Sequence, residues 1–129
     1  MFLPKDDKNY KWTGHIKNKM MYYRLSAQKI KNILKFYDRK EEGIAPKTQA
    51  VMKRNDTPKR KEEIWVMYSR RKVGTPTFLS KNKNSTSGQK TAETILISAW
   101  RYPGVSKKGS KIPVPDEILA EIQTWFNKK

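Results

Sequence analysis

Cysteine is absent from the 129-residue chain, and histidine occurs once, at His15. Without cysteine there is no disulfide framework, no thiolate ligand for zinc and no thiol nucleophile. A single histidine excludes a mechanism in which two imidazoles act as acid and base. No apolar run reaches the roughly 18 residues of a membrane-spanning helix, and the opening residues, three apolar and then charged, do not resemble a secretory signal. We therefore expect a cytoplasmic protein that uses no metal and no other cofactor.

Acidic residues are scarce, with 12 Asp and Glu against 29 Lys and Arg, so the net charge is +17. Such an excess predicts a polyanionic partner, because lysine and arginine release counterions from phosphates. Nucleic acid, and RNA before DNA, is the expected partner. The alternatives are an anionic membrane and an acidic protein. The chain lacks a basic helix of the kind that lies on membranes, which makes a membrane partner the weaker alternative.

Apolar spacing predicts two helices in the first third of the chain. In residues 12–23, Ile16, Met20 and Tyr23 recur at helical intervals. Ser26 suits the N-cap of a second helix, which ends near residues 38–43. The apolar stripe of that second helix consists of Ile30, Ile33, Leu34 and Tyr37.

A third helix is predicted over residues 115–126. Pro115 suits its first turn, and Asp116 and Glu117 favour its positive N-terminal end. Its apolar stripe consists of Ile118, Leu119, Ile122, Trp125 and Phe126. The helix contains acids but neither lysine nor arginine, so it could dock on the basic body, cover a basic cleft or serve in regulation.

Three strands are predicted, at residues 47–54, 62–69 and 94–101, and the first two are joined by a turn too short for a crossover helix. Strict alternation would place Ile95, Ile97, Ala99 and Arg101 on one face and Leu96, Ser98, Trp100 and Tyr102 on the other. A polar, basic insertion at 70–93 separates the last two strands, and we expect residues 80–91 of it to be flexible. The order predicts one α+β domain over residues 1–129. It has two N-terminal helices, a small antiparallel sheet of three to four strands and a C-terminal helix, with the helices on one face.

The succession of His15, LSAQKIKNIL, EIWVMY and ILISAWRYPG resembles the RelE/BrnT-like toxin superfamily over roughly residues 12–102. The resemblance implies a ribonuclease fold related to the barnase group. It also implies an endoribonuclease toxin, acting on free RNA or at the ribosome and silenced by an acidic antitoxin. The insertion at 70–93 and the helix at 115–126 depart from this pattern. Because many relatives of the fold have lost catalysis, the resemblance leaves enzymatic activity open.

Metal-free RNA cleavage needs a group that moves a proton and a cation that stabilises the phosphorane. Arg101, at the end of a strand, is the candidate clamp, with pairing to Glu62 or Glu63 as the alternative. His15 is the candidate acid or base, against an exposed or helix-capping histidine. The Tyr68 hydroxyl could assist proton transfer, or the ring could belong to the core.

Phosphate contacts are predicted from basic residues on two parts of the chain. Because His15 and Lys19 are four residues apart, they could grip one phosphate together. The candidate RNA-binding residues are Lys17, Lys19, Arg24, Lys59, Arg60, Lys61, Arg70, Arg71 and, by base stacking, Trp100. The alternatives are a solvated basic face, charged turn ends and a core position for Trp100. Three functions remain open: a metal-independent endoribonuclease toxin, a non-catalytic nucleic-acid-binding protein and a basic module for an acidic protein.

Overall fold

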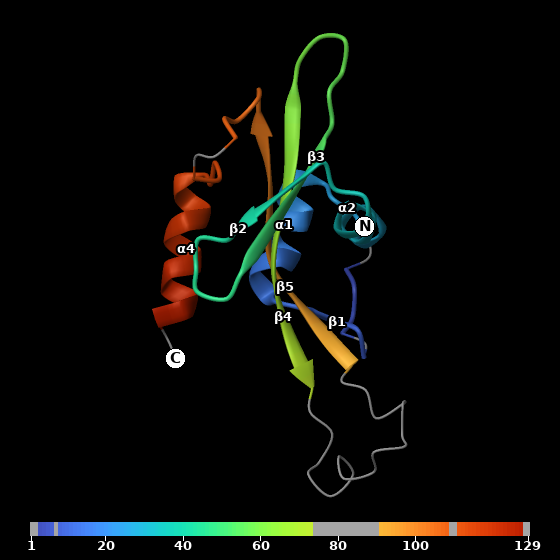
Figure 1. Cartoon of the computed structure of the whole chain (residues 1–129), viewed down its shortest axis with the longest axis vertical. Helices are drawn as coiled ribbons and strands as arrows, with labels where there is room; N and C mark the ends of the chain where they lie inside the picture. Colours follow the sequence, from blue (N-terminus) through green and yellow to red (C-terminus); the bar gives the residue numbers. More distant parts are fainter. Residues whose placement is uncertain (1–2, 7, 74–90, 109–110, 128–129) are drawn as a thin grey trace, which may run out of the picture.

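The computed structural model describes residues 3–6, 8–73, 91–108 and 111–127, except for the side chains of 71–73, 91–92 and 125–127 (Figure 1). This part of the chain has an α+β fold with three helices and a five-stranded mixed sheet. The elements are β1 Tyr10–Trp12, α1 Gly14–Tyr23, α2 Ala27–Lys35, β2 Arg39–Glu42, β3 Gln49–Arg54, β4 Glu62–Val73, β5 Thr91–Pro103 and α4 Asp116–Asn127. Among the described residues, no helix is long and apolar enough to cross a membrane.

The three predicted strands are confirmed as β3, β4 and β5, and β4 and β5 extend into the insertion between them. The sheet order is β1-β5-β4-β3-β2, with β1 parallel to β5 and every other pair antiparallel. The prediction of three to four antiparallel strands was therefore too small, because it missed β1 and β2. Strand β2 has the sequence RKEE, whose charges suit an edge strand but give no alternating apolar signal.

Both N-terminal helices are confirmed, although α2 ends at Lys35 and not near residues 38–43 as predicted, and a hydroxyl caps each of them. Thr13 Oγ1 accepts from the Ile16 N–H at 3.1 Å and donates to the Ile97 carbonyl at 3.0 Å. Helix α1 therefore begins at Gly14 and is tied to β5. Ser26 caps α2 as predicted, because its Oγ accepts from the Lys29 N–H at 3.1 Å.

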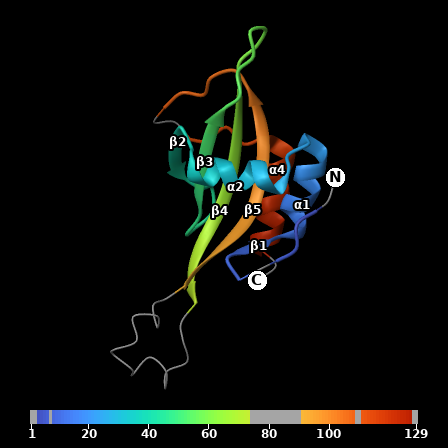
Figure 2. The same ribbon diagram turned by 90° about the vertical axis from the view of Figure 1, so that its right-hand side faces the viewer.

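Helices cover both faces of the sheet, which corrects the expectation that all of them pack on one face (Figure 2). One core lies under α1 and α2 and includes Trp12, Ile16, Met20, Leu25, Ile30, Ile33, Val51, Ile64, Val66, Tyr68, Leu96 and Ala99. The other lies under α4 and includes Ala50, Met52, Trp65, Met67, Ile97, Trp100, Ile112, Ile118 and Ile122. The apolar runs in β4 and β5 are nearly continuous because both strands are covered on both faces.

A bulge in β5 overturns the predicted alternation. Met67 pairs with Ser98, and Tyr68 pairs with Leu96, so Ile97 has no partner on β4. The extra residue shifts the pattern by one position. As a result Leu96 and Ala99 share the core under α1 and α2, whereas Ile97 joins the core under α4.

The predicted basic insertion is shorter than residues 70–93, because β4 continues to Val73 and β5 begins at Thr91. The segment predicted to be flexible, residues 80–91, lies outside the described residues except for Thr91. Helix α4 confirms the predicted C-terminal helix, with its start one residue later, at Asp116. The side chains of Trp125 and Phe126, predicted to belong to the apolar stripe of this helix, lie outside the described part of the structure.

Candidate nucleic-acid interface

Arg101 stands at the end of β5, and its side chain joins three elements. Its Nε donates to the Tyr23 carbonyl at 2.9 Å, and its Nη1 donates to Glu62 Oε1 at 2.7 Å. Burial would raise the pKa of Glu62, but hydrogen bonds from Asn55 and Arg101 outweigh it and lower that pKa. The pairing with Glu62 was the structural alternative predicted for Arg101. The guanidinium thus holds the end of α1 against the sheet.

His15 and Lys19 converge, as their spacing predicted, but they converge on a carboxylate of α4. Lys19 Nζ lies 2.7 Å from Glu121 Oε1, and His15 Nδ1 lies 3.3 Å from Glu121 Oε2. The other ring nitrogen of His15 lies 2.7 Å from Ser98 Oγ. Glu121 therefore occupies the position that a phosphate was predicted to take, and the cluster joins α1, β5 and α4.

The electrostatics of this cluster keep His15 neutral near pH 7. Burial is the largest influence and lowers the pKa of His15 below its ordinary 6.5, with Glu121 opposing and Lys19 adding to the effect. Ser98, His15 and Glu121 have the order of a nucleophile, base and orienting carboxylate. Ser98 is fully buried, however, so its hydroxyl does not meet a substrate. The cluster accordingly serves to attach α1 and α4 to the sheet.

The aromatic candidates lie in the core. Tyr68 is 3% exposed, and Trp100 is fully buried and stacks on Trp65 with the ring centroids 6.3 Å apart. The core positions that were the alternatives for Tyr68 and Trp100 are confirmed. Neither Tyr68 nor Trp100 therefore offers an exposed ring to a base.

The predicted phosphate contacts do not form one groove. Lys59, Arg60 and Lys61 are exposed on the turn before β4, while Arg70 is exposed near its far end. A strand rises about 3.3 Å per residue, so Lys61 and Arg70 lie roughly 30 Å apart. The Arg71 side chain is outside the description.

The two remaining candidates lie on α1 and its C-cap. Lys17 is half-buried on α1. Arg24 is exposed at the C-cap in a left-handed conformation, with φ 58°. The predicted contacts are thus spread over several sides of the molecule.

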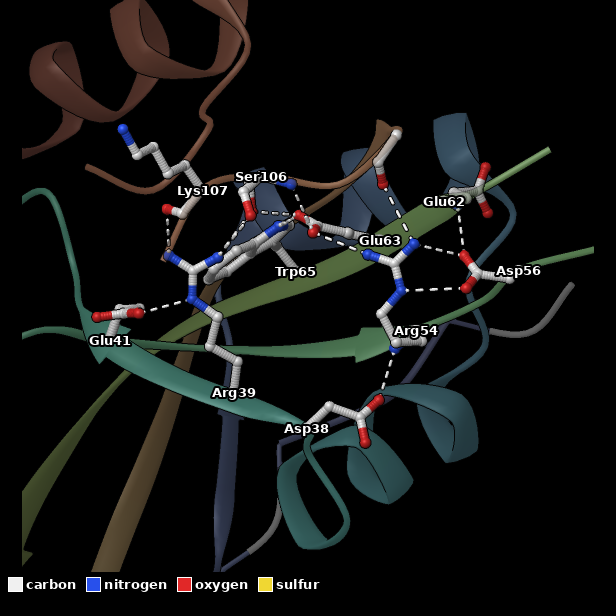
Figure 3. Close-up of polar contacts among 11 residues, drawn as sticks. Asp38, Arg39, Glu41, Arg54, Asp56, Glu62, Glu63, Trp65, Ser106 and Lys107 are labelled. Atoms are coloured by element: carbon white, nitrogen blue, oxygen red, sulfur yellow. Dashed lines mark hydrogen bonds and ion pairs between the residues drawn. The ribbon is translucent and has the colours of Figure 1, made fainter. Parts of the chain in front are cut away.

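Glu63, a buried carboxylate near the start of β4, lies in a hydrogen-bond network that the sequence did not reveal (Figure 3). Glu63 accepts four hydrogen bonds: from Arg54 Nη1 at 2.9 Å, Trp65 Nε1 at 2.9 Å, and the Ser106 amide and hydroxyl at 2.8 and 2.7 Å. Burial would raise the pKa of Glu63, but the bonds from Ser106 and Trp65 and the charge of Arg54 lower it. Glu63 therefore stays ionised while fully buried.

Arg39 extends this network to the segment that leads to α4. Its Nη1 donates to Ser106 Oγ at 2.8 Å, its Nη2 donates to the Lys107 carbonyl at 3.1 Å, and its Nε donates to Glu41 at 2.6 Å. The network borders an opening of about 540 Å³ between the β3–β4 turn and this segment. No sequence signal pointed to it, because Ser106 is 43 residues from Glu63 and 67 from Arg39.

Most carboxylates of the described residues are engaged by other groups of the chain, whereas many cations form no ion pair. Seven carboxylates bond or pair with other groups of the chain: Asp6, Asp38, Glu41, Asp56, Glu62, Glu63 and Glu121. Many exposed cations form no ion pair with another described residue. They are Lys5, Lys8, Arg24, Lys35, Lys40, Lys47, Lys59, Lys107, Lys108 and Lys111. The excess charge is thus displayed on the surface. Within the described ranges, no three His, Asp or Glu side chains lie close enough together to hold a metal ion.

The fold and the charge together define this chain as an α+β domain with a strongly basic exterior. No family model, curated protein or solved structure matches it. The resemblance to RelE/BrnT-like toxins stays a prediction that rests on the sequence segments that carry it.

Proposed function

We propose that this protein binds RNA in the cytoplasm through its basic exterior. The observation that carries the proposal is the surplus of exposed cations that form no ion pair with another described residue. Carboxylates such as Glu62 and Glu63 are engaged inside, while lysines such as Lys35 and Lys107 are exposed without an ion pair among the described residues. Phosphates would release their counterions to these cations, which gives strong and salt-sensitive binding.

Binding without cleavage is the form of this function that the geometry supports best. The candidate clamp Arg101 is engaged with Glu62 and the Tyr23 carbonyl, and Tyr68 is buried. His15 is engaged with Ser98 and Glu121. A cleaving enzyme would need these groups to face a phosphate. We therefore propose a non-catalytic RNA-binding relative of the RelE/BrnT-like toxins.

The second candidate is the metal-independent endoribonuclease toxin, and the state of His15 favours it. An imidazole with a lowered pKa is neutral near pH 7 and can accept the proton of a 2′-hydroxyl. Glu121, which pairs with His15, is 45% exposed. An RNA phosphate that displaced this carboxylate would meet both His15 and Lys19. In this function an acidic antitoxin would compete with RNA for the same cations.

One experiment separates these functions. End-labelled RNA is incubated with the protein in EDTA at physiological salt, beside His15→Gln protein of matched circular dichroism. The proposal expects intact RNA with reduced gel mobility for both proteins. Fragments with 2′,3′-cyclic phosphate ends that disappear in His15→Gln would favour the toxin. RNA that is neither shifted nor cut would overturn both functions for free RNA and favour an acidic protein partner.

A further inference from the structure

We propose that Phe36, with the depression beside it, is a subsite where an unpaired base of single-stranded RNA stacks. The inference rests on the proposed RNA-binding function and assigns one part of the surface to one part of the ligand. Such a subsite requires an exposed aromatic ring, space next to that ring and surrounding positive charge. The described residues supply all three.

The ring is presented at the end of α2. Phe36 is the C-cap of that helix and is 66% exposed, and the next residue, Tyr37, is 42% exposed. The depression has a volume of about 210 Å³ and is lined by Lys29, Asn32, Ile33, Phe36 and Lys53. It therefore lies where α2 passes over β3 (Figure 2). Exposure of so large an apolar ring costs hydration free energy, which a stacked base would recover.

The charge around the ring suits a phosphate backbone. Lys29 and Lys53 line the depression, and Lys35 is exposed on the last turn of α2. Asp38 is the nearby carboxylate, and it accepts from the Arg54 N–H at 2.8 Å and lies 3.4 Å from Lys53 Nζ. Because Lys53 pairs with Asp38, Lys29 and Lys35 supply the net positive charge of the rim. An aromatic face beside cations is the usual arrangement for binding single-stranded nucleic acid.

Tyr22 supplies a contrast within the same molecule. It is also 66% exposed, at the end of α1, and Lys19 lies 5.7 Å from its ring centroid. That lysine is already paired with Glu121, and Glu117 acts on the neighbouring Tyr23. The surface around Tyr22 is therefore partly acidic and unsuited to a phosphate chain. Equal exposure close to the carboxylates of α4 makes Tyr22 the matched control.

The test measures the affinity of the full chain for labelled oligouridine and for an RNA duplex of equal length by fluorescence anisotropy. Phe36→Ala should weaken oligouridine binding about tenfold, because stacking on an aromatic ring is lost. Duplex binding should change less than about twofold, since paired bases do not stack on the ring. Tyr22→Ala should leave both affinities unchanged. Phe36→Tyr should keep the oligouridine affinity, and ultraviolet cross-linking should attach uridine at position 36.

Unchanged oligouridine binding by Phe36→Ala would overturn the subsite, as would equal weakening of single strand and duplex. An equal effect of Tyr22→Ala would also overturn it. These results would leave the proposed RNA binding standing and make a protein partner the better occupant of the exposed ring. A wild-type protein that binds neither RNA at physiological salt would instead overturn the proposed function itself.

Discussion

At the scale of single residues, Glu63 shows how a basic protein keeps a buried charge. Its carboxylate is fully buried, yet Arg54, Trp65 and Ser106 supply four donors. We expect Glu63→Gln to lower the free energy of unfolding by about 3 kcal/mol, because an amide pairs poorly with these donors and leaves Arg54 partly uncompensated. Urea denaturation near neutral pH measures this. The exposed Glu42→Gln control should change it by less than about 0.5 kcal/mol.

The loss of unfolding free energy caused by Glu63→Gln should depend on pH. The pKa of Glu63 in the folded protein lies below its ordinary 4.5. Its contribution to stability is therefore complete above about pH 4.5 and is lost as the pH falls through the folded-state pKa. The difference between wild type and Glu63→Gln should narrow in acid. A difference that stays constant down to about pH 3 would contradict the ionised state of Glu63.

A second prediction about stability and pH concerns His15 and applies to a higher pH range. Burial places its folded-state pKa below 6.5, so the unfolded chain binds more protons as the pH falls through that value. The wild type should lose stability between about pH 7 and the folded-state pKa, and His15→Gln should lack this part of the loss. Urea midpoints measured at several pH values test this, and parallel profiles for the two proteins would refute it.

At the scale of elements, α4 is a structural part of the domain. Ile118 is fully buried, and it belongs to the core that contains Trp65 and Trp100. We expect Ile118→Ala to cost about 2–5 kcal/mol of unfolding free energy, as for other buried Ile or Leu residues. The exposed Gln123→Ala control should cost less than about 0.5 kcal/mol. A mild effect of Ile118→Ala in a thermal or urea melt would instead indicate that α4 is a detachable cover.

The sequence predicted those elements whose signal is local. Ser26 and the apolar stripe of α2 were sufficient to place that helix, and the apolar run around Trp65 placed β4. Strand β2 could not be found this way, since it is charged and pairs with β3 only through the backbone. The bulge at Ile97 was also hidden, because it depends on register against β4 and not on residue type. The predicted alternation therefore wrongly placed Ile95 and Ile97 on the face of Ala99 and Arg101.

In the candidate site, too, the sequence predicted only relationships between residues that are close in the chain. The spacing of His15 and Lys19 correctly predicted that they converge. It could not predict that Glu121, more than 100 residues away, would pair with both of them. The network around Glu63 likewise depends on Ser106, 43 residues further along the chain. Long-range partners of this kind decide whether a basic side chain is available to a ligand.

At the scale of the whole molecule, the net charge is +17, and many exposed cations form no ion pair with another described residue. RNA affinity should therefore fall steeply with salt. For single-stranded RNA, the logarithm of the affinity should decrease linearly with the logarithm of salt, by about 0.7 for each phosphate contacted. Six contacts would weaken binding by about 300-fold between roughly 50 and 200 mM salt.

This salt dependence distinguishes a contacting lysine from one that only contributes to the net charge. Lys35→Gln, beside the exposed Phe36, should weaken oligouridine binding and reduce the slope by about 0.7, because one phosphate contact is removed. Phe36→Ala should weaken binding without changing the slope, since a stacked base releases no counterion. Anisotropy titrations at several salt concentrations measure both slopes. If Lys47→Gln, on the β2–β3 turn, reduced the slope as much as Lys35→Gln, charge alone would govern binding and no particular surface would be preferred.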